Sequence, residues 1–227
     1  MENRFEYMDR GYGRAMVFLP GWATDCRIFD GIEASWDYVR VRGFDPVSFQ
    51  EPLAAFLDER AIEKAALCGF SMGGFAAVEF ARRFPHRVNR LFLIGIRERY
   101  PKRQLDFVRE RLKEDAAGYL ASFFARCFHK KETAETFHAR LFPRYRKRID
   151  TEHLLSTLDY LGAVDIRCEY FIPEIPVTFI HGDCDEIAPF EEVRRIKNGM
   201  VHGELAVLAN AGHLCFLEKD IRGAIDG

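Results

Sequence analysis

The chain has 227 residues, of which 48% are hydrophobic and 30% charged, and its formal net charge is −2. This length suits one domain with a sizeable core, and the composition is ordinary for a globular enzyme. The longest apolar runs, such as residues 15–19 and 91–96, are too short to cross a bilayer, and the charge argues against a nucleic-acid partner.

Strand and helix signals alternate along the first hundred residues, which predicts an α/β fold. Strand patterns occupy 14–19, 38–43, 65–68 and 88–96, and helical patterns occupy 52–60 and 75–84, with little room for two strands before residue 14. Strand signals return at 176–180 and 204–208, and a last helix of about three turns follows, with Leu214, Leu217, Ile221 and Ile225 on one stripe. We expect a mostly parallel central sheet with helices on both faces.

Residues 101–162 show only helical periodicity. The sequence therefore predicts a core formed by 1–100 and 163–227, with a helical insertion at 101–162 that would act as a lid.

The first four residues carry mixed charge without an apolar run, which predicts no signal peptide. Six cysteines without C-x-x-C spacing predict reduced thiols in a cytoplasmic protein, with no disulfide framework and no metal site.

The sequence Gly69-Phe70-Ser71-Met72-Gly73-Gly74 lies where a predicted strand passes into a predicted helix. A G-x-S-x-G motif in that position is typical of a nucleophile elbow, because its glycines permit a turn that projects the serine hydroxyl above the sheet. We therefore predict Ser71 as a nucleophile.

A serine hydroxyl needs a base and an acid that orients the base. Asp185 follows the strand at 176–180 and has Pro189 downstream, so it is the preferred acid, with Asp183 as the alternative. His213 follows the strand at 204–208 and is the predicted base. The order Ser71, Asp185, His213 is the chain order that this elbow motif accompanies. Both aspartates could instead serve only as turn residues.

Two backbone N–H groups are predicted to stabilise an oxyanion, each by roughly 3–4 kcal/mol. Met72 follows the nucleophile and opens a helix. Trp22 lies in the loop after the first strand, where Gly21 lets the backbone approach the substrate closely. Cys68, Cys184 and Cys215 flank the three segments, which raises a thiol nucleophile as an alternative, but none occupies the elbow.

These motifs resemble the α/β-hydrolase superfamily over nearly the whole chain. Within it, Leu19-Pro20-Gly21-Trp22 and the elbow look most like the pimeloyl-acyl-carrier-protein methyl ester esterases of biotin synthesis, the BioH type. Those carry a His-Gly-Trp-Gly loop and a Gly-Trp-Ser-Leu-Gly-Gly elbow. The chain departs from them with Pro20, Ala23, Phe70 and Cys215; Phe70 would change the wall of the acyl pocket.

The predicted insertion is basic. Residues 97–150 hold 15 lysines and arginines against 8 acids, a net charge of +7, within a chain of net charge −2. Acyl carrier proteins are acidic, and lid arginines dock them in the resembled family, which implies docking roles for Arg140, Arg144 and Arg148. The other interpretation is that these side chains form ordinary solvated helix faces.

The sequence thus predicts a serine carboxylesterase without metal or organic cofactor, and the resemblance implies the methyl ester of pimeloyl-acyl carrier protein as substrate. Alternatives are a general short-chain carboxylesterase, an acyltransferase, or a ligand-binding protein that keeps the fold without catalysis.

Overall fold

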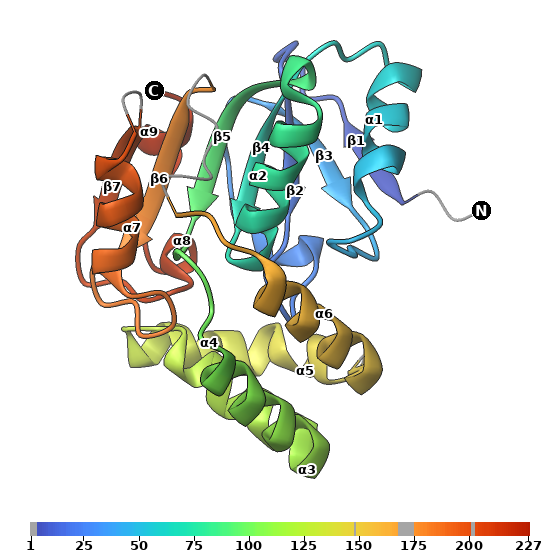
Figure 1. Cartoon of the computed structure of the whole chain (residues 1–227). Coiled ribbons are helices and arrows are strands. Elements are labelled where there is room, and N and C mark those ends of the chain that lie inside the picture. The colour runs from blue at the N-terminus through green and yellow to red at the C-terminus, as the bar shows by residue number, and fades with distance from the viewer. Residues whose placement is uncertain (1–3, 148, 168–174, 201–202) are drawn as a thin grey trace.

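Seven strands of the described residues form one sheet in the order β1-β3-β2-β4-β5-β6-β7 (Figure 1). The computed structural model describes residues 4–147, 149–167, 175–200 and 203–227. Only the β1–β3 pair is antiparallel among the paired strands. The strands are β1 (Phe5–Met8), β2 (Ala15–Leu19), β3 (Asp37–Val41), β4 (Ala65–Phe70), β5 (Val88–Ile94), β6 (Val177–Gly182) and β7 (Gly203–Leu208).

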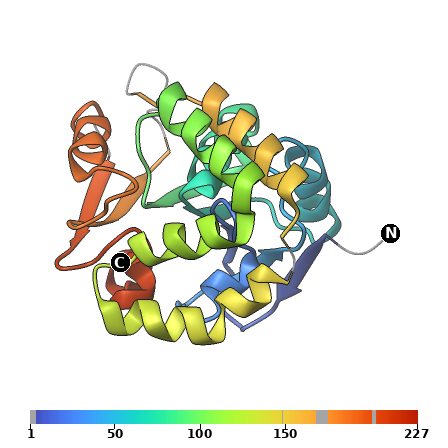
Figure 2. The ribbon, with the colours of Figure 1, turned by 90° about the horizontal axis from the view of Figure 1, so that it is seen from below.

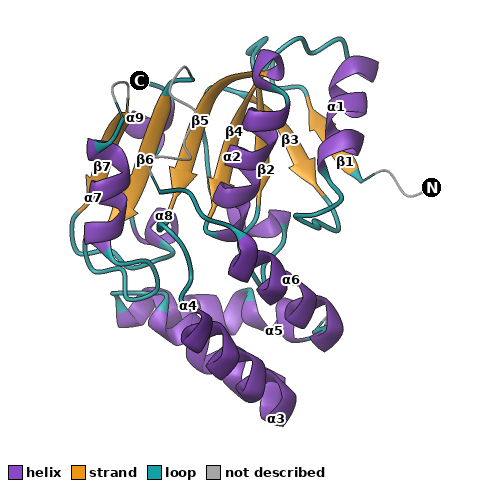
Figure 3. Cartoon of the chain, viewed as in Figure 1, coloured by secondary structure: helices purple, strands orange, loops and turns teal. Residues whose placement is uncertain are grey.

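Helices cover both faces of this sheet, as predicted. In the view of Figures 1 and 3, α1 (Gln50–Glu59), α2 (Met72–Arg83) and α7 (Phe190–Asn198) lie in front of the strands. Two short helices, α8 (Cys215–Glu218) and α9 (Arg222–Ile225), lie behind them. Strands β2, β4 and β6 are buried along their whole length, because helices cover them on both sides.

The structure corrects three details of the sequence prediction. The edge strand β1 was not predicted, and neither was α7. The prediction of a single last helix was wrong, because the segment is divided into α8 and α9 with Lys219 extended between them. The physical reason is local, because the Asp220 carboxylate accepts the backbone N–H of Arg222 and so competes with continuation of the helix.

The helical insertion connects β5 to β6, which are neighbouring parallel strands. It contains α3 (Lys102–Arg126), α4 (Lys131–Arg140), α5 (Phe142–Arg146) and α6 (Thr151–Ala163). These helices lie across the carboxyl ends of the strands, with α3 and α6 side by side (Figures 1 and 2). Helix α3 is kinked at Asp115, whose carboxylate accepts the Gly118 N–H and caps the second half.

No helix among the described residues is both long enough and apolar enough to span a membrane.

The turn from β4 into α2 depends on close backbone packing. A Cβ atom on Gly73 would overlap the carbonyl oxygen of Leu19, and one on Gly69 would overlap the carbonyl oxygen of Gly73. The first turn of α2 therefore lies directly against the end of β2. Backbone atoms are the obstacle in both cases, so a side-chain movement cannot relieve the overlap.

We predict that Gly73→Ala lowers the free energy of unfolding by about 3 kcal/mol or more, because the added methyl must displace backbone. Urea unfolding followed by circular dichroism measures this. Gly223→Ala is the matched control, since nothing lies within 4 Å of a Cβ there. Equal stability of the two variants would contradict the packing described for the turn.

Candidate functional site

Ser71 occupies a backbone conformation that L-residues rarely adopt, with φ 51° and ψ −115°. It lies between β4 and α2, and its N–H donates to the carbonyl of Ile94 on the adjacent strand at 2.8 Å. The residue is buried. A strained serine held by neighbouring strands at the carboxyl edge of a parallel sheet is the geometry of a nucleophile elbow.

Asp185 and His213 come together at the same edge. Asp185 follows β6 and His213 follows β7, and the two strands are neighbours. His213 Nδ1 lies 2.7 Å from Asp185 Oδ2, and both side chains are almost completely shielded from solvent. The other carboxylate oxygen of Asp185 accepts the N–H groups of Ile187 and Ala188, each at 2.8 Å.

The environment keeps Asp185 ionised. Burial alone would raise the pKa of this carboxyl, but His213, His181 and the backbone donors outweigh burial and hold the pKa below its usual value. An ionised carboxylate accepts, so Nδ1 of His213 carries the proton and donates it. Nε2 of His213 is then free to accept a proton.

The alternative acid, Asp183, has another structural role. Its carboxylate accepts the N–H of Asn210 at 2.7 Å and so ties the loop after β6 to the loop after β7. Asp183 is solvent-exposed, and His213 is paired with Asp185 instead.

Ser71 and His213 line one small cavity together with Trp22, Phe123 and Cys127. The space open to a water-sized molecule in it is about 10 Å³, enough for roughly one water. No hydrogen bond joins Ser71 to His213 in the described part of the chain. The Phe70 ring packs against the His213 ring, with 5.0 Å between centroids, and so supports the imidazole from the side.

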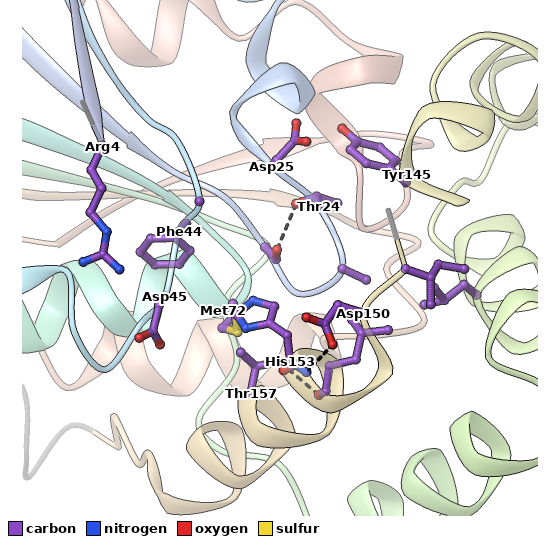
Figure 4. A pocket seen from close by; sticks show the side chains of 16 residues that line it. Arg4, Thr24, Asp25, Phe44, Asp45, Met72, Tyr145, Asp150, His153 and Thr157 are labelled. Atoms are coloured by element: carbon purple, nitrogen blue, oxygen red, sulfur yellow. Dashed lines mark hydrogen bonds between the residues drawn. The ribbon is translucent and has the colours of Figure 1, made fainter. Parts of the chain in front are cut away.

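The Trp22 loop and Met72 face a common space. Gly21, Ala23 and Met72 line a pocket of about 490 Å³, which His153, Leu154 and Thr157 of α6 also line. Figure 4 shows Met72, His153 and Thr157 close together in it. We call it the interface pocket, since it lies between the core and the helical insertion. The indole of Trp22 donates to the carbonyl of Leu154 at 3.2 Å. Met72 is the first residue of α2, where backbone N–H groups have no intrahelical acceptor.

The predicted lid arginines lie away from both cavities. Arg140 at the end of α4 and Arg144 in α5 are exposed and line neither the small cavity nor the interface pocket. Arg148 lies outside the described residues. The structure therefore does not bring Arg140 or Arg144 to Ser71.

The flanking cysteines are not placed as nucleophiles. Cys68 is buried within β4 and Cys215 within α8. Burial raises the pKa of both thiols, which keeps them protonated near neutral pH. For Cys184 the hydrogen bond with Asp183 raises the thiol pKa.

Tyr100 was missed by the sequence analysis. Its hydroxyl lies 3.5 Å from Ser71 Oγ, and burial raises the pKa of Tyr100 to about 12, so the hydroxyl stays protonated. The buried Arg97 guanidinium lies over the Tyr100 ring. It also donates to the carbonyl of Ile187, in the loop that carries Asp185. Tyr100 lies in a loop without any motif, so no sequence signal could have identified it.

Glu218 was missed as well. Its carboxylate accepts the N–H of Gly212, next to His213, and the N–H of Lys130, in the turn between α3 and α4, each at 2.6 Å. Leu214 also donates to the carbonyl of Cys127 at 2.9 Å. The loop that carries His213 is thus fastened to the helical insertion.

Comparisons with known proteins show the family and the fold of the chain. The model of the protein family described as alpha/beta hydrolase fold matches residues 21–220 of the chain. The chain is 27% identical to the AB hydrolase superfamily protein YisY of Bacillus subtilis, over 93% of this chain and 89% of that protein. It is 24% identical to a pimeloyl-[acyl-carrier protein] methyl ester esterase of Nitrosomonas europaea, over 91% of each chain.

Solved structures share the fold. An esterase from Exiguobacterium antarcticum has a TM-score of 0.78 at 19% identity, covering 94% of this chain and 89% of that one. The enol-lactonase from Burkholderia xenovorans also has a TM-score of 0.78 at 19% identity, covering 94% and 90%.

We predict that Glu218→Ala lowers the free energy of unfolding by about 2 kcal/mol, because two backbone N–H groups lose their acceptor. Urea unfolding measures the change. Glu186→Ala is the control, since this carboxylate is exposed and its contact with Arg126 is long, at 3.6 Å; its effect should stay below about 0.5 kcal/mol. Similar losses in both variants would show that Glu218 does not fasten the loop.

Proposed function

Because the chain belongs to the α/β-hydrolase fold family, we propose that it is a serine carboxylesterase in which Ser71, His213 and Asp185 act as a catalytic triad. The observation that carries the proposal is the buried 2.7 Å contact between His213 and Asp185 at the sheet edge where Ser71 adopts its strained turn. Family membership supports a hydrolase; the ester specificity is our inference.

The proposed reaction has two steps. In the first, His213 Nε2 takes the Ser71 proton while Oγ attacks the ester carbonyl, and the backbone N–H groups of Trp22 and Met72 receive the oxyanion. The alcohol leaves with the proton that His213 returns. In the second, water attacks the acyl-serine with the same assistance, and the acid departs. The Tyr100 hydroxyl, a neutral donor beside Oγ, would help to orient the serine.

We further propose the methyl ester of pimeloyl-acyl carrier protein as the substrate. A relative of that name is 24% identical over 91% of each chain, and residues 97–150 carry a net charge of +7. An exposed basic face on α4 and α5, with Arg140 and Arg144, suits an acidic carrier.

Ser71→Ala should abolish hydrolysis of p-nitrophenyl butyrate, because the nucleophilic oxygen is gone while the chain still folds. The residual rate is measured against the uncatalysed background, and a fluorophosphonate probe should no longer label the protein. Ser156→Ala, on the exposed side of α6, is the control and should retain full activity. Unchanged turnover by the Ser71 variant would refute the proposed nucleophile.

Asp185→Asn should lower kcat by about 10³- to 10⁴-fold, because an amide no longer fixes the imidazole tautomer. Asp183→Asn is a matched control two residues away. Its amide oxygen can still accept the Asn210 N–H, so kcat should change less than about threefold. Steady-state kinetics with p-nitrophenyl butyrate compares the two. Comparable losses in both variants would argue against the assignment of Asp185.

Docking of a carrier protein is tested by charge reversal. Arg140→Glu combined with Arg144→Glu should raise KM for the pimeloyl-carrier methyl ester about tenfold at low salt, through repulsion of the acidic carrier. Turnover of p-nitrophenyl butyrate should not change. Arg194→Glu combined with Lys197→Glu on α7 is the control with equal charge change. If carrier-ester KM responds equally to both pairs, the docking face is wrong.

A further inference from the structure

A second buried histidine lies beside the Asp185 carboxylate and has no part in the reaction proposed above. His181 belongs to β6, close to its carboxyl end, and its side chain is fully shielded from solvent. Its Nε2 atom lies 2.8 Å from the carbonyl oxygen of Ala188 and 3.5 Å from Asp185 Oδ2. That carboxylate oxygen is the one that His213 contacts. His181 therefore reaches both the acid and the loop that carries it.

The two ring nitrogens of His181 have different surroundings, which determines where its proton lies. A carbonyl oxygen only accepts, so Nε2 carries the proton and donates it to Ala188. Nδ1 is buried and has no hydrogen-bond partner in the part of the chain that the structure describes. In a charged ring the Nδ1–H would be a buried donor without an acceptor, which is costly. The ring is therefore neutral, with its proton on Nε2.

The charged groups around His181 do not alter this state. Burial is the largest influence and lowers the pKa of His181 below its usual value, and His213 acts in the same direction. Asp185 and Glu192 act in the opposite direction, as does the bond to Ala188, without cancelling burial. The Phe190 ring, 6.0 Å away between centroids, carries no charge. His181 thus supplies a fixed N–H donor instead of a second charge beside Asp185.

Hydrogen bonds hold the turn from Asp185 to Ala188 on both sides of its backbone. The N–H groups of Ile187 and Ala188 donate to Asp185 Oδ1. The carbonyl of Ala188 accepts from His181, and the carbonyl of Ile187 accepts from Arg97 at 3.1 Å. Ile187 and Ala188 are buried, so water cannot readily replace these donors. Loss of the His181 N–H would release one side of the turn that aims the carboxylate.

We propose that His181 is a positioning residue for the triad: its Nε2–H holds the Ala188 carbonyl and thereby keeps Asp185 Oδ2 within bonding distance of His213. This inference rests on the proposed function, because it assigns a role in that reaction to a residue outside it. His181 lines neither the small cavity nor the interface pocket. It exchanges no proton during turnover and acts only through the carboxylate that fixes the imidazole tautomer.

The state of the ring is tested first, on the unmodified protein. Long-range ¹H–¹⁵N NMR distinguishes a protonated ring nitrogen from an unprotonated one. His181 should carry its proton on Nε2 alone at neutral pH. A proton on Nδ1, or a charged ring, would overturn the inference. This measurement needs neither a substrate nor a variant, so it stands whether or not the esterase proposal holds.

Two amide substitutions separate the role of Nε2 from that of polarity alone. The side-chain amide of His181→Gln can reach the position of Nε2, whereas that of His181→Asn ends near the position of Nδ1. With p-nitrophenyl butyrate, kcat should fall about tenfold for His181→Asn and less than about threefold for His181→Gln, with KM unchanged in both. Equal kcat values in the two variants would contradict a role for the Nε2–H.

Thr178→Val is the matched control for loss of a buried polar group on the same strand. Thr178 lies near the opposite end of β6 from the site, and its hydroxyl contacts Arg90 and Glu204. This variant should be less stable in urea without a change in kcat. A fall in kcat equal to that of His181→Asn would show that general loosening of β6, and not the bond to Ala188, lowers the rate.

A double-mutant cycle tests whether His181 acts through the carboxylate. On the Asp185→Asn background, His181→Asn should change kcat by less than about twofold, because no carboxylate is left to position. A further tenfold loss on that background would overturn the inference. Failure of the esterase proposal looks different, because the unmodified protein would then leave p-nitrophenyl butyrate intact while the NMR result for His181 stands.

Discussion

The contact between Asp185 and His213 organises the rest of the site. It joins the loops that follow β6 and β7, and both groups are out of contact with water. A buried carboxylate is costly unless donors surround it, and Asp185 meets this condition with the imidazole and two backbone N–H groups. These bonds fix the tautomer of His213 and also hold the acid loop in shape. The tautomer of His213 and the shape of the loop after β6 therefore both depend on the Asp185 carboxylate.

The helical insertion is fastened to the parts of the core that carry the site. The bonds run from Trp22 to the Leu154 carbonyl, from Tyr160 to Glu79 on α2, and from Lys130 to Glu218. The loop with Trp22, helix α2 and the loop with His213 are thus each bonded to a different part of the insertion. Phe123, Phe124 and Cys127 from the insertion line the small cavity that Ser71 also lines. The larger interface pocket is lined by Met72, the residue after Ser71.

The chain differs from the resembled esterases at two positions beside His213, Phe70 and Cys215. Phe70 stands where those proteins have tryptophan, and it contacts both His213 and Phe216. Cys215 begins α8 and is buried. The Phe70 ring therefore supports the imidazole, in addition to any contact with substrate.

The sequence alone determined the α/β class, the elbow at Ser71 and the order of the three site segments. These features have local signals, since glycine spacing marks the sharp turn and alternating apolar runs mark the strands. The sequence could not decide several others. The sequence favoured Asp185 over Asp183, but only the fold shows which carboxylate contacts His213. Tyr100 and Glu218 contact residues far away in the chain. Only the tertiary structure places these groups, because long-range contacts leave no periodic pattern in the residues that make them.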